Sequence, residues 1–90
     1  MRFEWDPAKA RRNLAKHGVS FEEAATVFAD RLSLTTFDPD HSEDEDRYLL
    51  LGASYAARLV VVSHTHRGES VRIISARIAS RRERREYAGG

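Results

Sequence analysis

The apolar residues of the first thirty positions recur with a helical period. After Ser20 they fall at i, i+3, i+4 and i+7, which is one stripe of an amphipathic helix: Phe21, Ala24, Ala25 and Phe28. Ser20 and Glu23 have the spacing of a capping box, in which each side chain bonds the backbone N–H of the other residue. The pattern therefore predicts a helix that starts after Ser20 and reaches Phe28.

A first helix is predicted just before it, over residues 8–17. Asp6 suits the N-cap and Pro7 the first helical position, whereas Gly18 is typical of the residue that follows a helix. Residues 2–5 precede this helix and have the composition of a short strand. The chain therefore begins with a strand and two helices joined by a tight turn.

The period changes from helical to alternating after Asp30. A strand that ends at Asp38-Pro39 is predicted by residues that alternate with polar neighbours: Leu32, Leu34 and Thr36. Three further β-rich runs follow, separated by short turns: residues 47–54, 58–66 and 70–77. Ser80 and Glu83 have the spacing of a second capping box, which predicts a short final helix.

The predicted order of elements is β-α-α-β-β-β-β-α, which favours an α+β fold. We expect a small antiparallel sheet of four main strands plus the short N-terminal strand, with the helices on one face. No repeat, low-complexity linker or domain boundary interrupts the 90 residues, which suffice for one core. The expected organisation is a single domain over residues 1–90.

The composition excludes several classes of protein. The chain has no cysteine, so it forms no disulfide and no thiolate metal site, which fits a reducing compartment. Its longest apolar run, residues 59–62, is too short to span a bilayer, and the first residues lack the apolar segment of a secretory leader. We expect a soluble, cytoplasmic protein that does not associate with a membrane.

The charged residues are distributed unevenly, although the formal net charge is only +1. Thirteen of the fifteen basic residues are arginine, whose planar fork matches phosphate geometry better than the lysine ammonium does. Seven arginines lie in residues 67–87, whereas residues 38–46 hold six acidic side chains and no Lys or Arg. The chain therefore combines an acidic middle segment with a basic C-terminal quarter.

The arginines of the final helix are predicted to share one surface. At about 100° per residue, three of them fall within about 100° of arc and a fourth lies beside them: Arg81, Arg84, Arg85 and Arg82. Glu83 and Tyr87 point to the opposite side, so we expect Tyr87 to anchor the helix on the sheet. The arginines could bind phosphate. Alternatively, this is a solvated helix neutralised by its own glutamates or by the acidic segment 38–46.

Arg77 ends a predicted strand, so its side chain is expected at the sheet edge beside the final helix. His64 and His66 share one face of the neighbouring strand, which places an imidazole near Arg77 if the strands pair through the turn at residues 67–69. An imidazole beside arginine forks could supply acid–base catalysis and charge stabilisation for phosphodiester cleavage by the RNA 2′-OH. The alternative is that these are ordinary strand histidines.

Other chemistries have little support in the sequence. The acidic residues and His41 within residues 38–44 could ligate a cation, but their spacing lacks the glycine and terminal glutamate of a calcium loop. The glycines form no phosphate-binding loop, and no serine stands in a nucleophile elbow. We therefore predict neither a metal site nor a cofactor.

Three phrases of the sequence are more specific than its composition. They are FEWDPAKARRNLAKHGVSFEEAATVF at residues 3–28, EDRYLLLGAS at 45–54 and RIISARIASRRERREY at 72–87. In this order they resemble the BrnT family of ribonuclease toxins. The resemblance implies a RelE-like fold, cleavage of RNA and inhibition of translation.

The same resemblance implies a protein partner. It would be a BrnA-like antitoxin with a ribbon-helix-helix domain, in a heterotetramer of two toxins and two antitoxins. The toxin would then associate with DNA only indirectly, through the antitoxin.

The resemblance and the arginine pattern together suggest the site. The predicted catalytic residues are Arg77, Arg81, Arg85 and His64. The predicted RNA-binding residues are Trp5, Lys16, His17, Arg47, Arg82 and Arg84. Trp5 could instead be a core aromatic, and Lys16 and His17 could serve only as positive charges at a helix C-terminus.

Two functions remain open at this stage. The first is a metal-independent endoribonuclease that uses the substrate 2′-OH as nucleophile, with guanidinium groups in place of a metal's charge. The second is a non-catalytic module that docks RNA or an acidic protein on the same arginines.

Overall fold

The computed structural model describes residues 1–89 and contains the predicted elements in the predicted order. They are β1 (Arg2–Glu4), α1 (Pro7–His17), α2 (Phe21–Thr26), β2 (Leu34–Phe37), β3 (Tyr48–Ala53), β4 (Leu59–Arg67), β5 (Ser70–Ile78) and α3 (Arg81–Tyr87). Two short 3₁₀ turns were not predicted: η1 (Val27–Ala29) and η2 (Pro39–His41). In the described part of the chain, no helix is long and apolar enough to cross a membrane.

The caps of α1 and α2 follow the sequence signals, with one exception. The Asp6 carboxylate accepts a hydrogen bond from the Ala8 N–H at 2.8 Å, and Gly18 ends α1 with φ of 70°. The Ser20 hydroxyl accepts from the Glu23 N–H at 3.0 Å. Glu23 does not return the bond that a capping box requires, because its carboxylate is bonded to the side chains of Ser54 and Arg58 instead.

The five strands form one sheet in the order β1-β5-β4-β3-β2. The four main strands are antiparallel to their neighbours, as predicted. β1 differs, because it pairs with β5 in parallel, with Phe3 opposite Val71. The sheet is therefore mixed. In the sequence, α1 and α2 lie between β1 and the other strands. In the sheet, β1 forms the edge beside the last strand, β5.

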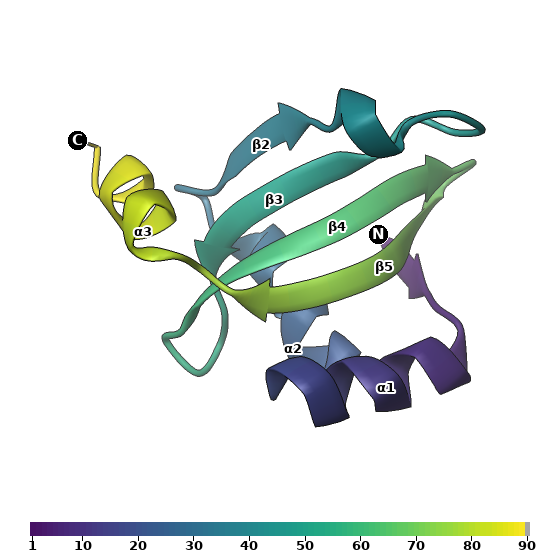
Figure 1. Ribbon diagram of the computed structural model, residues 1–90, viewed down its shortest axis with the longest axis horizontal. Helices are drawn as coiled ribbons and strands as arrows, with labels where there is room; N and C mark the ends of the chain where they lie inside the picture. Colours follow the sequence, from purple (N-terminus) through teal and green to yellow (C-terminus); the bar gives the residue numbers. More distant parts are fainter. Residues whose placement is uncertain (90) are drawn as a thin grey trace.

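α1 and α2 cover one face of the sheet, and α3 packs against the other (Figure 1). The main core lies under α1 and α2 and consists of Val19, Phe21, Ala24, Val27, Leu50, Val60, Val62, Ile73 and Ala76. A smaller cluster of Leu51, Val61 and Ala79 lies on the other face, where Tyr87 of α3 packs against it. The expectation that all helices share one face holds for α1 and α2 and is wrong for α3.

A bulge between β4 and β5 changes which side chains face the helices. Ser63 lies opposite Ser75, but His64 lies opposite Ile73, so one residue of β5, Ile74, has no partner. Ile73 before the bulge and Ala76 after it both face α1 and α2. Arg77 therefore lies on the opposite face of the sheet, which we call the open face.

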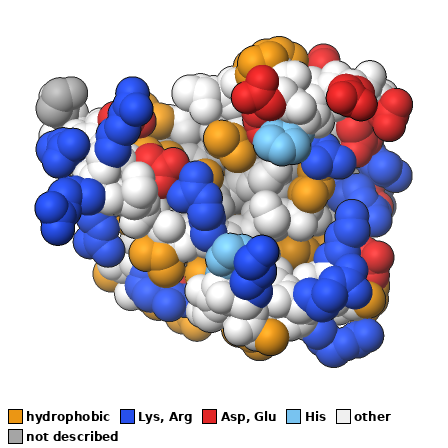
Figure 2. Space-filling view, in the orientation of Figure 1, with side chains coloured by type: hydrophobic (Ala, Val, Ile, Leu, Met, Phe, Trp, Pro, Cys, Tyr) orange, Lys and Arg blue, Asp and Glu red, His pale blue; other side chains and the backbone are white. Residues whose placement is uncertain are grey.

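The open face carries a depression between regions of opposite charge (Figure 2). Lys and Arg side chains gather on the left over α3 and again at the lower right, and acidic side chains gather at the upper right. The central area between them consists mostly of uncharged atoms. The open face thus has an uncharged centre, bordered by basic side chains on the left and lower right and by acidic side chains at the upper right.

Asn13 of α1 fills a gap in the hydrogen bonding of β5. Its side-chain amide donates to the Ala76 carbonyl at 2.8 Å and to the Val19 carbonyl at 2.9 Å, and its oxygen accepts from the Ala76 N–H at 3.1 Å. β1 pairs with β5 only at residues 70–72, so the side chain of Asn13 takes the place of a strand backbone further along. This contact also ties α1 to the strand just beyond the bulge.

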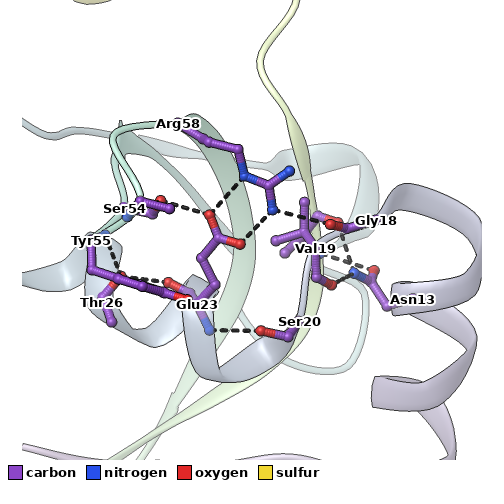
Figure 3. A network of polar contacts seen from close by, with 11 residues as sticks. Asn13, Gly18, Val19, Ser20, Glu23, Thr26, Ser54, Tyr55 and Arg58 are labelled. Carbon is purple, nitrogen blue, oxygen red and sulfur yellow. Dashed lines mark hydrogen bonds and ion pairs between the residues drawn. The ribbon is translucent and has the colours of Figure 1, made fainter.

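A second buried polar network joins α2 to the turn between β3 and β4 (Figure 3). The Glu23 carboxylate accepts from the Ser54 hydroxyl at 2.6 Å and from the Arg58 Nε at 2.9 Å. Arg58 also donates to the Gly18 carbonyl at 3.0 Å. Hydrogen bonding to Arg58 keeps the pKa of the Glu23 carboxyl below its usual range despite its burial. The ion pair thus holds the turn between the helices against the sheet.

We expect Asn13→Ala to destabilise the fold more than its small loss of volume suggests. It leaves buried carbonyl and N–H groups without partners, which costs about 2–4 kcal/mol in the free energy of unfolding. Urea denaturation followed by circular dichroism measures this change. Arg12→Ala, at the exposed neighbouring position, is the control and should change stability by less than about 0.5 kcal/mol. Equal urea midpoints for the two variants would show that the Asn13 contacts contribute little.

Candidate functional site

α3 is capped at its start and anchored to another segment at its end. At its start, the Ser80 hydroxyl accepts from the Glu83 N–H at 3.2 Å and the Glu83 carboxylate accepts from the Ser80 N–H at 2.8 Å, which completes the predicted capping box. At its end, the Tyr87 hydroxyl donates to the Asp30 carboxylate at 2.6 Å. Tyr87 is therefore the anchor that the helical spacing predicted.

The other side of α3 presents arginines to solvent. We call this the arginine surface; it consists of Arg81, Arg82, Arg84 and Arg85, all exposed. Arg82 lies 3.4 Å from Glu86 across one helical turn, but both side chains are largely exposed, so this pair is weak. No ion pair within residues 1–89 joins the arginine surface to the acidic segment 38–46, whose own side-chain contacts are a hydrogen bond between His41 and Asp38 and an ion pair between Arg67 and Glu45. The acidic segment therefore does not cover these arginines.

Arg77 lies beside α3 and is held by a two-pronged ion pair. Its two Nη atoms donate to the two carboxylate oxygens of Glu83 at 2.7 and 2.9 Å. Arg77 remains 43% exposed. Hydrogen bonding to Arg77 lowers the pKa of the Glu83 carboxyl to about 2, so the pair is ionised at neutral pH. Glu83 thus orients the Arg77 guanidinium while it caps α3.

His64 does not lie near Arg77, and this prediction is wrong. Arg77 pairs with Val61 on the open face, whereas His64 pairs with Ile73 and points toward the helices. The imidazole is only 2% exposed and packs edge-on against Phe28, with ring centroids 4.8 Å apart. Burial lowers the pKa of the His64 imidazole and favours its neutral form. His64 is therefore part of the core aromatic packing and not of a site with Arg77.

Trp5 also lies with the core and not with the arginines. Its ring packs edge-on against Phe21, with centroids 5.9 Å apart, and it joins the cluster under α1 and α2. Of the two interpretations of Trp5 in the sequence analysis, RNA binding and core packing, this position agrees with core packing.

Lys16 and His17 lie at the exposed C-terminal turn of α1, where they form a second basic region. Together with Lys9, Arg12 and Ile74 they border a shallow hollow of about 320 Å³ beside β5. α1 contains no acidic side chain, so this helix is basic along its length. The two regions of predicted RNA-binding residues, on α1 and α3, thus belong to opposite faces of the sheet.

Arg47 lies apart from both basic regions. It borders a hollow of about 320 Å³ that is otherwise lined by the acidic segment, including Asp40, Glu43 and Glu45. Its Nε is buried without a hydrogen-bond partner. Carboxylates therefore surround Arg47, which makes it a poorer phosphate ligand than the arginines of α3.

The chemistry available at this site is the stabilisation of negative charge. Arg77 and the arginine surface place several guanidinium groups at one border of the open face, where they could contact the oxygens of a phosphodiester. Within residues 1–89, no group of three or more His, Cys, Asp or Glu side chains is arranged to hold a metal ion. The pairing of Glu83 with Arg77 was not predicted from the sequence. A signal for this pair exists: an arginine at the end of a strand is followed, at short spacing, by a glutamate at the third position of a capped helix.

We predict that α3 loses its attachment to Arg77 in acid. The pKa of Glu83 is about 2 in the folded protein, below its usual 4.5, so its contribution to stability is present above pH 4.5 and is lost as the pH falls toward 2. With solvent screening of this partly exposed pair, the contribution is on the order of 1–2 kcal/mol. Unfolding of the wild type and Glu83→Gln at pH 6 and at pH 2–3 measures it. A stability difference that stays constant over this range would contradict the assignment.

Comparison with known proteins agrees with this architecture. The family model described as "Ribonuclease toxin, BrnT, of type II toxin-antitoxin system" matches residues 5–83. The structure is similar to the 1.1 Å crystal structure of the Brucella abortus ribonuclease toxin BrnT, with a TM-score of 0.66 and 26% sequence identity. The match covers 90% of this chain and 99% of that chain. No protein of curated function matches significantly. Because the family model spans most of its length, the chain belongs to the BrnT family of ribonuclease toxins of type II toxin–antitoxin systems.

Proposed function

We propose that this chain is a metal-independent endoribonuclease that arrests translation in the cytoplasm and needs no cofactor. The observation that carries the proposal is the position of Arg77, which Glu83 holds on the open face beside α3, the helix that carries the arginine surface. Guanidinium groups are the protein's strongest phosphate ligands. Arg77 supplies one of them from β5, and the arginine surface supplies four from α3. Membership of the BrnT family supports ribonuclease activity.

The proposed reaction is a transesterification within the RNA. The 2′-oxygen attacks the adjacent phosphorus and gives its proton to a base, while the bond from phosphorus to the 5′-oxygen breaks and the leaving oxygen takes up a proton. The products are a 2′,3′-cyclic phosphate and a 5′-hydroxyl. Extra negative charge develops on the non-bridging oxygens, and in this proposal Arg77 stabilises it, assisted by Arg81 and Arg85. Arg82 and Arg84 extend the binding surface for the backbone.

RNA binding would also involve regions outside the arginine surface. Lys16 and His17 offer a second phosphate contact at the end of α1, and Arg47 offers a weaker one, because it borders a hollow lined by the acidic segment. Because the contacts are mainly between arginine and phosphate, the affinity for RNA should fall steeply as the salt concentration rises. Trp5 and His64 lie in the core and have no place in the proposed site.

The first test of this proposal is Arg77→Ala. Loss of a guanidinium that stabilises the transition state should lower the rate of RNA cleavage by about 10²–10³-fold. The wild type should cleave RNA in excess EDTA and leave 2′,3′-cyclic phosphate ends, which mass spectrometry of the fragments detects. Arg77→Lys keeps the charge without the fork and should recover only part of the rate.

Arg72→Ala is the matched control for Arg77→Ala. Arg72 lies on the same strand and contacts Glu4 at 3.4 Å, away from α3, so this variant should retain most of the activity. Circular dichroism of each variant separates a loss of fold from a loss of catalysis. Cleavage that stops on chelation would refute the metal-independent mechanism, and RNA binding without cleavage by the wild type would favour the docking-module alternative.

We further propose that a BrnA-like antitoxin silences the toxin by covering the arginine surface and the adjoining border of the sheet. Within residues 1–89 the acidic segment forms no ion pair with the arginine surface, so it does not neutralise these arginines. Antitoxin carboxylates facing the arginines would remove the RNA site directly. Two toxins and two antitoxins would form the complex, with DNA bound only by the antitoxin.

A charge reversal on α3 tests this model. The double variant Arg81→Glu and Arg85→Glu should weaken antitoxin binding by about 2–4 kcal/mol, on the scale of charge pairs that become buried in interfaces. The control carries the same charge change on α1, as Arg11→Glu and Arg12→Glu. Titration calorimetry at several salt concentrations measures both. If the α3 variant binds as tightly as the wild type, the antitoxin covers another surface.

A further inference from the structure

The outer edge of β2 is uncovered and carries neither a charged residue nor a proline. β2 is the last strand of the sheet, and all four of its residues, Leu34–Phe37, are exposed (Figure 1). None of them is charged and none is proline. The opposite edge, β1, has only three residues, two of which are Arg2 and Glu4. Edges like that of β2 readily accept another strand.

The backbone of β2 has donors and acceptors that point away from the sheet. The Asp38 N–H donates to the Arg47 carbonyl at 2.9 Å, which sets the phase of the pairing with β3. By the alternation of an antiparallel ladder, Leu34 and Thr36 bond to β3, whereas the backbone groups of Thr35 and Phe37 point outward. β3 is the only strand that pairs with β2 within residues 1–89. The outward groups are therefore available to a further strand.

Apolar side chains surround this edge. Phe37 is 51% exposed, Leu34 is 43% exposed and Leu32, just before the strand, is 71% exposed. Phe37 also stacks edge-on against Tyr48, with ring centroids 5.6 Å apart, which holds it at the edge. An added strand would remove this apolar surface from water as well as satisfy the backbone groups.

The charges at the two ends of β2 have opposite signs. Exposed Arg31 precedes the strand, and α3 is attached at the same end, because Tyr87 bonds to Asp30. The acidic segment 38–46 follows the other end. β2 itself is neutral, so the molecule is electrostatically polarised along this strand. A strand that pairs here should therefore carry the reverse polarity.

We propose that β2 pairs with β2 of a second copy of this chain, antiparallel and about a two-fold axis at Thr36. In this register the outward backbone groups of Thr35 in each copy bond to those of Phe37 in the other copy. The two β2 edges are then paired with each other, and the two sheets become one continuous sheet. The inference goes beyond the proposed function and does not depend on RNA cleavage.

Charge complementarity is the reason for choosing a second copy and an antiparallel arrangement. An antiparallel pair brings Arg31 and the arginine-rich end of each copy beside the acidic segment of the other, whereas a parallel pair would place like charges together. The arrangement also gives a role to the acidic segment, which does not neutralise the arginine surface within the same chain.

Sedimentation equilibrium of the full chain tests the pairing. The wild type should show a monomer–dimer equilibrium, and Thr36→Lys should weaken it at least about tenfold, because two lysines would meet at the axis. Ala56→Lys, in the exposed turn between β3 and β4, adds the same charge elsewhere and should dimerise like the wild type. A wild type that is monomeric up to millimolar concentrations would overturn the proposal.

A charge exchange tests the orientation. Arg31→Asp and Asp40→Arg should each weaken the dimer by roughly three- to tenfold, because each lost pair occurs twice, and the double variant should recover most of the loss. Failure of the double variant to recover would contradict the antiparallel pairing. If Thr36→Lys leaves the dimer intact but abolishes antitoxin binding, the edge belongs to the antitoxin and the proposal is wrong.

Discussion

The unpaired residue in β5 determines how the rest of the molecule is arranged. Without the bulge at Ile74, strict alternation along β5 would turn Arg77 toward α1 and α2, where an unpaired guanidinium would cost several kcal/mol. With it, the small and fully buried Ala76 occupies that place, and Asn13 bonds to both of its backbone groups. The bulge is thus stabilised from the helix side, and its consequence is a charged residue on the open face.

Because the bulge turns Arg77 to the open face, Arg77 connects β5 to α3. Arg77 can reach Glu83 only from the open face, and Glu83 at the same time caps α3. A helix this short with four exposed arginines would be marginal alone, since like charges repel and nucleation is costly. The ion pair, the cap and the bond from Tyr87 to Asp30 offset that repulsion, and they leave the arginines exposed to solvent.

The distribution of charge follows from the same geometry. α3 projects from one end of the open face and the acidic segment lies toward the other, so neither neutralises the other within one chain. A surface of this kind attracts polyanions and acidic partners from solution.

The local features were determined by the sequence itself. Apolar periodicity and short-range caps depend only on neighbouring residues, so the helices, the strands, the α+β class and the anchoring role of Tyr87 could all be predicted, and the BrnT phrases indicated the family. The wrong expectations all required contacts between distant segments. Strict alternation placed His64 near Arg77, but a bulge shifts every following side chain to the other face, and whether one forms depends on which residues must be buried under the helices. The parallel pairing of β1, the side of the sheet on which α3 packs and the choice of Arg58 as partner for Glu23 were likewise decided only by the tertiary structure, because each balances burial against hydrogen bonding among residues far apart in the chain.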